Sequence, residues 1–251
     1  MSKEKDIPNI RQKRSHDINT LFKLQNHKPT KLLDIGFGNC AIAEYYSSFG
    51  IEVSGVEVSI QSYQKAIERN IPNLKLYLYD GIHLPFDDCY FDTIILNDVL
   101  EHISYKEIEL LIPEILRVLE PHGLIYISVM NRWQILEPHK LIPFLTWLPK
   151  PFWHPLCKRI TGTDYLTYYP YTRKRAEKLF NKFNLQYIDM SYIYVQNKFL
   201  GKNPVGSRTT RRILNFLLKL RLRRIAYILA LRVTVLLYLV RVDTPLDEKG
   251  H

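Results

Sequence analysis

The 251-residue chain is 46% hydrophobic and 24% charged, which is enough apolar material for a folded core. Its net charge of +10, from 35 basic and 25 acidic residues, favours anionic partners such as nucleic acid, lipid headgroups or phosphorylated molecules. The widely separated Cys40, Cys89 and Cys157 give no disulfide framework and no zinc spacing, so we expect no metal and a reducing compartment. The sequence has no secretory signal and no stretch of about 18 apolar residues, which predicts a cytoplasmic protein without a simple transmembrane helix.

Apolar runs and helical patterns alternate along the first half of the chain. An amphipathic helix is predicted over 9–26, closed by Pro29. Strands are predicted over 31–36, 51–59, 73–80, 91–98 and 124–130. Helices are predicted over 41–50, 60–70 and 104–123, the last of them ended by Pro121 and Gly123. Strands that alternate with helices predict a parallel sheet covered by helices on both faces.

The second half departs from this rhythm. Residues 131–170 are rich in proline and aromatic residues and are predicted to be an insertion above the sheet. A helix is then expected over 172–184, and strands over 185–196 and 232–242. The predicted organisation is an N-terminal helical segment over 1–28 and an α/β domain over 29–251, with insertions at about 131–170 and 200–231.

A glycine-rich turn follows the first predicted strand, at Gly36 and Gly38. Glycine allows a tight turn and a close approach by a ligand, and the following helix N-terminus favours a negatively charged group. Glu57 ends the second predicted strand, where an acid accepts hydrogen bonds from a ribose diol. A turn without ligand is one alternative. An NAD site is another, because Ala41 occupies the third glycine position of the dinucleotide fingerprint and alanine is sometimes allowed there.

The motifs in this region resemble those of class I S-adenosylmethionine-dependent methyltransferases, especially the ubiquinone- and menaquinone-methyltransferase-like group. The resemblance lies in five motifs, in the family's order, within residues 31–130: Leu33-Asp34-Ile35-Gly36-Phe37-Gly38, Gly55-Val56-Glu57-Val58-Ser59, Asp80-Gly81-Ile82-His83-Leu84-Pro85-Phe86, Phe91-Asp92-Thr93-Ile94-Ile95 with Val99-Leu100-Glu101-His102, and Leu116-Arg117-Val118-Leu119-Glu120-Pro121-His122-Gly123. NAD enzymes are not expected to show the last three. Cys40 departs from the family pattern, which usually has glycine there.

The resemblance implies a Rossmann-like, seven-stranded, mostly parallel sheet whose last strand is antiparallel. It also implies S-adenosylmethionine as the cofactor, with Glu57 on the ribose and Asp80 at the adenine. The predicted cofactor-binding residues are Asp34, Gly36, Gly38, Glu57, Val58, Asp80, Gly81 and Asn97.

Two histidines are candidate catalytic residues. Methyl transfer from a sulfonium is a direct displacement, in which positioning and desolvation supply much of the rate, and a base is needed only if the acceptor loses a proton. His102 follows the fourth predicted strand, and His139 lies in the first insertion. A structural role at the start of a helix is the alternative for His102, and a surface-loop position is the alternative for His139.

The insertion over 131–170 is the predicted acceptor lid. Its aromatic residues suit a hydrophobic or ring-shaped acceptor, although ordinary lid packing explains any one of them: Trp133, Trp147, Phe152, Trp153, Tyr165, Tyr168 and Tyr169.

The second insertion, over 200–231, reads as a basic amphipathic helix. Leu214, Leu217, Leu218, Ile225, Ile228 and Leu229 would share one face of it, opposite Arg208, Arg212, Lys219 and Arg223. This pattern suits a helix resting on an anionic membrane surface, or a helix packed on the domain with a solvated basic face. The predicted location is therefore the cytoplasm, with a peripheral position at the inner face of a membrane as an option.

The sequence therefore predicts O-methylation of a lipid-linked, quinone-like or glycan acceptor near the cytoplasmic membrane face. An RNA methyltransferase, an NAD-dependent oxidoreductase and a non-catalytic, membrane-associated donor-binding protein stay open as alternatives.

Overall fold

The computed structural model describes residues 7–165, 168–200 and 235–241, and also 212, 216–217, 219–222, 225–226 and 228–229. A seven-stranded sheet with the order β3-β2-β1-β4-β5-β7-β6 forms its centre. The strands are β1 (Lys31–Ile35), β2 (Glu52–Glu57), β3 (Leu74–Leu78), β4 (Phe91–Asn97), β5 (Leu119–Val129), β6 (Gln186–Asp189) and β7 (Leu236–Arg241). β7 pairs antiparallel with both β5 and β6, whereas β1 to β5 pair in parallel. The predicted mostly parallel sheet with an antiparallel last strand is confirmed.

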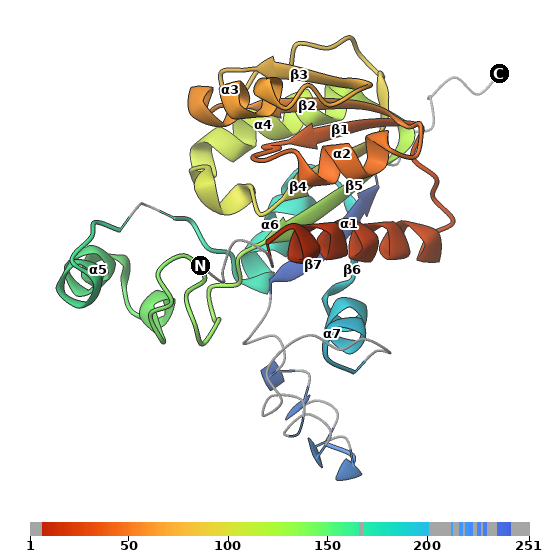
Figure 1. The fold of residues 1–251 in the computed structure, drawn as a ribbon. Helices are drawn as coiled ribbons and strands as arrows, with labels where there is room; N and C mark the ends of the chain where they lie inside the picture. Colours follow the sequence, from red (N-terminus) through yellow and green to blue (C-terminus); the bar gives the residue numbers. More distant parts are fainter. Residues whose placement is uncertain are drawn as a thin grey trace.

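Helices cover both faces of the sheet (Figure 1). The main helices are α1 (Ile7–Leu24), α2 (Ala41–Ser47), α3 (Ile60–Glu68), α4 (Tyr105–Val118), α5 (Trp153–Thr161), α6 (Arg173–Lys182) and α7 (Ser191–Leu200). Buried side chains of α4 and α6 pack on one face, and those of α1, α2, α3 and α7 pack on the other. The N-terminal helix α1 thus contributes Ile18, Leu21 and Phe22 to the core of the main sheet.

The chain reverses its direction of winding at β1. β1 is hydrogen-bonded to β2 on one side and to β4 on the other, so the loops after β1 and β4 diverge above the same edge. Ligands of open α/β sheets bind at the carboxyl ends of the strands at such a switch point. The last four residues of β1 are buried, as expected for a central strand covered on both faces.

The helix predicted over 104–123 is shorter in the structure. A capping box between Ser104 and Glu107 starts α4, which ends at Val118. Leu119 already pairs with Phe91, and the register of β5 against β4 shifts before Leu124. Pro121 cannot donate a helical hydrogen bond and disfavours helical geometry at the preceding residue, so these residues join β5 through an irregularity.

The strand predicted over 185–196 is also only partly correct. β6 ends at Asp189, and α7 begins at Ser191, whose backbone N–H donates to Asp189 Oδ1 at 2.8 Å. Met190 and Tyr194 are both buried against the sheet, four residues apart. That spacing is helical, and it was hidden in the sequence by β-favouring Tyr, Ile and Val residues.

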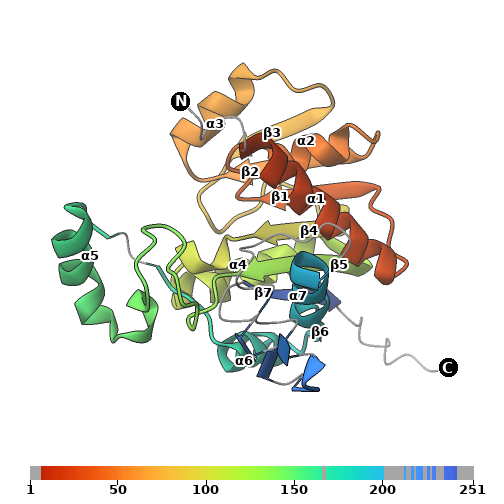
Figure 2. The ribbon, with the colours of Figure 1, turned by 60° about the horizontal axis from the view of Figure 1, so that its bottom comes forward.

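The insertion over 131–170, hereafter the lid, stands to one side of the sheet in both views (Figures 1 and 2). It contains the 3-10 turns η2 (Leu145–Trp147) and η3 (Lys150–Phe152) and the helix α5. A small hydrophobic cluster of its own holds it together: Met130, Ile142, Leu145, Trp153, Cys157, Tyr165 and Tyr168. Its two ends meet where Asn131 bridges to Tyr171 and the Arg132 N–H donates to the Tyr171 carbonyl at 2.8 Å.

The predicted basic helix over 200–231 falls largely outside the described residues. In the part of the chain that the structure describes, no helix has both the length and the apolar character needed to cross a bilayer.

Candidate active site

The turn after β1 fixes the backbone of the candidate site. Gly36 has a φ of +70°, and its N–H donates to the Val56 carbonyl at 2.8 Å, which joins the turn to β2. A Cβ at this position would lie 2.8 Å from Cγ2 of Val99, a residue of the loop after β4. Gly36 therefore lets three segments meet at the switch point.

We expect Gly36→Ala to lower the free energy of unfolding by roughly 2–4 kcal/mol, because two effects destabilise the variant. They are the strain of an alanine in the left-handed conformation and the overpacking of its Cβ against Val99. Gly50→Ala is the matched control, because Gly50 has a φ of +77° but open space around it. It should cost only about 1 kcal/mol. Urea unfolding followed by circular dichroism measures both, and equal losses would contradict the proposed crowding at Gly36.

Cys40, the departure from the family pattern, precedes α2 in a left-handed conformation with a φ of 62°. Its side chain is fully buried among residues of α1 and α2. The backbone geometry explains why glycine suits this position, while the thiol fills space that glycine would leave empty.

Because these two effects oppose each other, we expect Cys40→Gly to change the unfolding free energy by less than about 1 kcal/mol. Cys40→Val should cost more than about 2 kcal/mol, since a β-branched residue is poorly tolerated at positive φ. Urea titrations of both variants test this, and a valine as well tolerated as the glycine would disprove the backbone argument.

Glu57 binds the glycine turn through backbone N–H groups. Its Oε2 accepts from the Gly38 N–H at 3.0 Å, and its Oε1 accepts from the N–H groups of Val58 and Ser59, each at 3.0 Å. The carboxylate is buried at the end of β2 and borders the largest cavity of this edge. Three of the roughly four acceptor positions of the carboxylate are occupied by these N–H groups, so Oε2 can still accept a hydrogen bond from a ribose hydroxyl.

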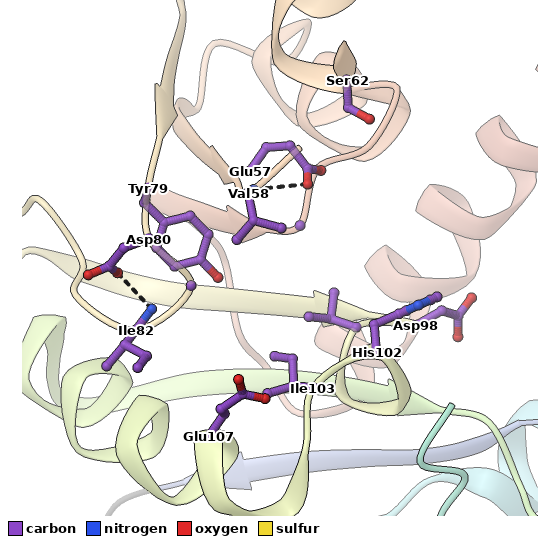
Figure 3. A pocket seen from close by; sticks show the side chains of 13 residues that line it. Glu57, Val58, Ser62, Tyr79, Asp80, Ile82, Asp98, His102, Ile103 and Glu107 are labelled. Atoms are coloured by element: carbon purple, nitrogen blue, oxygen red, sulfur yellow. Dashed lines mark hydrogen bonds between the residues drawn. The ribbon is translucent and has the colours of Figure 1, made fainter. Parts of the chain in front are cut away.

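Two adjoining cavities flank Gly36 at the carboxyl ends of β1, β2 and β4. The larger, of about 640 Å³, is lined by His102 (Figure 3) and by four predicted cofactor residues besides Gly36: Glu57, Val58, Asp80 and Gly81. The smaller, of about 370 Å³, contains Asp34, Gly38 and Asn97. Gly36 and Asp98 border both, so the two form one elongated site in which all the predicted cofactor residues come together.

The smaller cavity suits a cationic amino group. Asp34 is buried, and among the described residues its Oδ2 has no hydrogen-bond partner. Burial raises the pKa of Asp34 to about 7. A hydrogen bond from the Ala43 backbone lowers this pKa, and the nearby Glu57 carboxylate raises it further. A bound ammonium group would supply the missing hydrogen-bond donor and would stabilise the ionised form of Asp34. The methionine part of S-adenosylmethionine has such an ammonium group.

The larger cavity suits a flat ring. Tyr79, Ile82 and Ile103 provide apolar surface, with Asp80 at the edge (Figure 3). Asp80 accepts from the N–H groups of Ile82 and His83 at 2.8 and 2.7 Å, and its contact with the His83 side chain helps to lower its pKa to about 2. The loop after β3 thus holds an ionised acceptor where the exocyclic amine of an adenine can reach it.

The two candidate histidines lie together. The rings of His102 and His139 have centroids 5.6 Å apart, and Tyr168 contacts both, stacked on His139 at 4.0 Å and edge-on to His102 at 5.1 Å. His102 borders the larger cavity, whereas His139, in the lid, contacts the ring of His102. Burial lowers both pKa values below the ordinary 6.5, and for His102 the neighbouring His139 adds to this effect.

His102 lies near the start of a helix, as its alternative interpretation expected, but not within that helix. It ends the turn η1 (Leu100–His102), and its N–H donates to the Val99 carbonyl at 2.9 Å. This turn precedes α4 without being part of it. The aromatic residues of the lid fall into two groups by burial. Trp153, Tyr165 and Tyr168 are buried, whereas Trp133, Trp147 and Phe152 are exposed.

Sequence reasoning missed the contribution of α1. Arg14 extends into the smaller cavity and pairs with Asp98 at 3.2 Å, across 84 positions of sequence. Asp98 adopts a φ of +57° directly after β4. An Asp that follows a buried strand was a usable signal, but nothing in the sequence connected it to Arg14. The Leu-Glu-His motif also contains Glu101, which is buried and whose pKa is raised by burial and by the charge of Asp98.

The sheet order, the glycine turn and the acidic end of β2 are those of the class I methyltransferase fold. Residues 33–127 match the family model of the methyltransferase domain. This match, together with the fold, supports a class I S-adenosylmethionine-dependent methyltransferase domain in this region, in agreement with the predicted class of enzyme and its cofactor.

Known proteins are similar to this chain in sequence over part of its length or in fold. An uncharacterized protein of Methanocaldococcus jannaschii, MJ0638, is 29% identical over 117 residues, which are 47% of this chain and 48% of that relative; the match thus spans about half of the relative's length. PH0226 protein from Pyrococcus horikoshii OT3 has a similar structure, with a TM-score of 0.59, 18% identity and coverage of 91% and 89% of the two chains. The plantazolicin methyltransferase BpumL in complex with SAH gives a TM-score of 0.59, 18% identity and coverage of 96% and 86%.

Proposed function

We propose that this protein transfers a methyl group from S-adenosylmethionine to an oxygen of a lipid-linked, quinone-like or glycan acceptor at the cytoplasmic face of a membrane. The placement in the ubiquinone- and menaquinone-methyltransferase-like group is part of this proposal. The observation that carries it is the pair of imidazoles, His102 and His139, between the cofactor cavity and the lid. A hydroxyl acceptor loses its proton on methylation, and a neutral imidazole at that position can take it.

The cofactor supplies an activated methyl group, and the chain supplies its placement. Asp34, Glu57 and Asp80 would hold the amino group, the ribose and the adenine, respectively, as argued from their free lone pairs and cavity positions. His102 would take the acceptor proton, and Tyr168 would hold the two imidazoles in place and exclude water.

The outer surface of the lid supports an apolar acceptor. It exposes large apolar side chains that the small core of the lid does not use: Trp133, Leu136, Leu141, Phe144, Trp147, Leu148 and Phe152. The described residues of the second insertion also expose Phe216, Leu220, Ile225 and Ile228. Exposed apolar surface near basic residues suits the headgroup region of a membrane, which is the basis for proposing a peripheral location.

Transfer of isotope label from S-adenosylmethionine tests this proposal. Purified protein is incubated with lysate and membranes of the source cells, and lipid, glycan, RNA and small-molecule fractions are separated, with the Asp34→Ala, Glu57→Ala double variant as control. Label in the lipid or glycan fraction that disappears with the variant supports the proposal. Label in RNA instead would identify an RNA methyltransferase, and donor binding without any transfer would favour a binding protein.

A further inference from the structure

We propose that the base of the lid binds the phosphate or diphosphate group of a phosphorylated acceptor. The site consists of Arg132, Lys150 and Arg175, hereafter the cationic cluster. Arg132 follows β5, Lys150 begins η3 and Arg175 lies in the first turn of α6. The assignment of the bound anion to the acceptor rests on the proposed function, whereas binding of the anion does not.

Shared aromatic rings bring the three cations together. The guanidinium carbon of Arg175 lies 3.0 Å from the ring centroid of Tyr105, and Lys150 Nζ lies 5.7 Å from the same centroid. Lys150 Nζ and the guanidinium carbon of Arg132 are each 5.9 Å from the Trp153 centroid. Residues distant in sequence thus converge between the lid, α4 and α6.

The cluster has no counter-charge within the described part of the chain. No carboxylate lies within ion-pair distance of Arg132, Lys150 or Arg175 there, whereas Arg14 and Arg117 each pair with acidic side chains. The Nε of Arg132 is buried, and it too has no hydrogen-bond partner among the described residues. A buried donor without an acceptor is costly, so the arrangement favours an anionic ligand.

The surrounding charges strengthen this argument. Burial lowers the pKa of Lys150, and the charges of Arg132 and Arg175 lower it further, which shows mutual repulsion within the cluster. The first turn of α6 contains no acidic residue, although cations are unfavourable at a helix N-terminus. An anion bound between the three side chains would relieve both effects.

The ligand class follows from the donors. Two arginines and a lysine present planar forks and a mobile ammonium, which match the oxygens of a phosphate or diphosphate better than a single carboxylate. A cavity of about 130 Å³ beside the cluster is bordered by Arg175 and Lys178, and also by Lys182, whose charge is paired with Glu109 at 2.6 Å. A phosphorylated lipid and a soluble phosphate ester share this chemistry.

The cluster lies next to the proposed catalytic histidines. Tyr169 stacks under Lys150, whose Nζ is 3.9 Å from its ring centroid, while the neighbouring Tyr168 contacts His102 and His139. The Tyr169 N–H also donates to the Glu101 carbonyl at 2.7 Å, which fixes this segment to η1. One acceptor molecule can therefore place its phosphate on the cluster and its methylated oxygen at His102.

The test is calorimetric titration of the full chain with inorganic pyrophosphate, with and without saturating S-adenosylhomocysteine to occupy the cofactor site. The variants are Lys150→Gln and Arg175→Gln, with Arg175→Lys as the conservative change. Lys174→Gln is the matched control, because Lys174 is an exposed cation adjacent in α6. Circular dichroism of each protein verifies folding, and binding of S-adenosylmethionine is measured separately. Co-sedimentation with phosphatidylcholine vesicles, with and without phosphatidic acid, distinguishes a lipid phosphate from a soluble one.

We expect pyrophosphate binding to weaken roughly tenfold or more in Lys150→Gln and Arg175→Gln, less in Arg175→Lys, and not in Lys174→Gln. Vesicle binding that needs phosphatidic acid and the same two side chains assigns the phosphate to a lipid, and pyrophosphate binding without it assigns a soluble ester. Absence of both, or equal weakening by Lys174→Gln, overturns the site. Pyrophosphate binding by a protein that fails to bind S-adenosylmethionine would refute the proposed function and leave the anion site standing.

Discussion

Glu57→Gln is expected to raise the dissociation constant for S-adenosylmethionine by roughly 10- to 100-fold, the equivalent of losing one charged hydrogen bond. The carboxylate oxygens accept from three backbone N–H groups. A glutamine amide would turn its NH2 group toward at least one of these donors, so the glycine turn would shift and the ribose would lose its acceptor. Calorimetric titration with the cofactor measures the effect.

Glu68→Gln serves as the matched control, because Glu68 is an exposed residue at the end of α3. It should leave the dissociation constant unchanged. Circular dichroism establishes that both variants are folded. A folded Glu57→Gln protein that binds the cofactor like the parent would remove Glu57 from the cofactor site.

His102→Gln is expected to lower kcat by about 10²–10⁴-fold, the usual range for loss of a general base. Cofactor binding should persist, since the acceptor side of the cavity changes and the ribose side does not. His139→Gln should have a smaller effect, roughly tenfold, because we expect His139 to act only through its influence on the pKa of His102. Single-turnover kinetics with the labelled cofactor separates binding from transfer.

The pH profile distinguishes the two roles. A lowered pKa keeps His102 neutral, and thus able to accept a proton, at pH values where an ordinary imidazole is already charged. The acid limb of kcat should therefore lie below pH 6.5 in the parent protein. His139→Gln removes one cause of the lowering, so the limb should move to higher pH.

His154→Gln, on an exposed lid histidine, is the control and should change neither rate nor profile. If the His102→Gln, His139→Gln double variant turned over at the parent rate, the acceptor would not need a base from this pair.

Much of the fold was predictable because local signals agreed with one another. Apolar runs ending at Gly36 and Glu57 marked central strands, and the structure brings both residues to the same cavity at the carboxyl ends of these strands. The signals failed where tertiary contacts override local preference. Tyr194 belongs to a β-favouring segment, yet its burial beside Met190 is achieved by a helix. Arg14 reaches Asp98 only because α1 packs across the sheet.

The acceptor side was harder to predict for a physical reason. His102, His139 and Tyr168 belong to different segments, and their meeting depends on how the lid folds back. No periodic pattern encodes such a contact. The aromatic content of the lid indicated an apolar segment, but it did not separate the buried Trp153 from the exposed Trp147.

Because the two ends of the lid pair with each other, the lid can be replaced as a unit to change which acceptor is used. Asn131 and Tyr171 bridge, and the small core of the lid shares no residue with the two clusters that hold the sheet. A segment whose two ends lie side by side can be exchanged as a cassette if its contacts with Glu101, His102 and Tyr105 are kept, because closing a longer or shorter loop between fixed ends changes the folding free energy only slowly with length. Recombinants that swap residues 131–171 between related chains should therefore keep the cofactor half intact and inherit the acceptor range of the segment's donor.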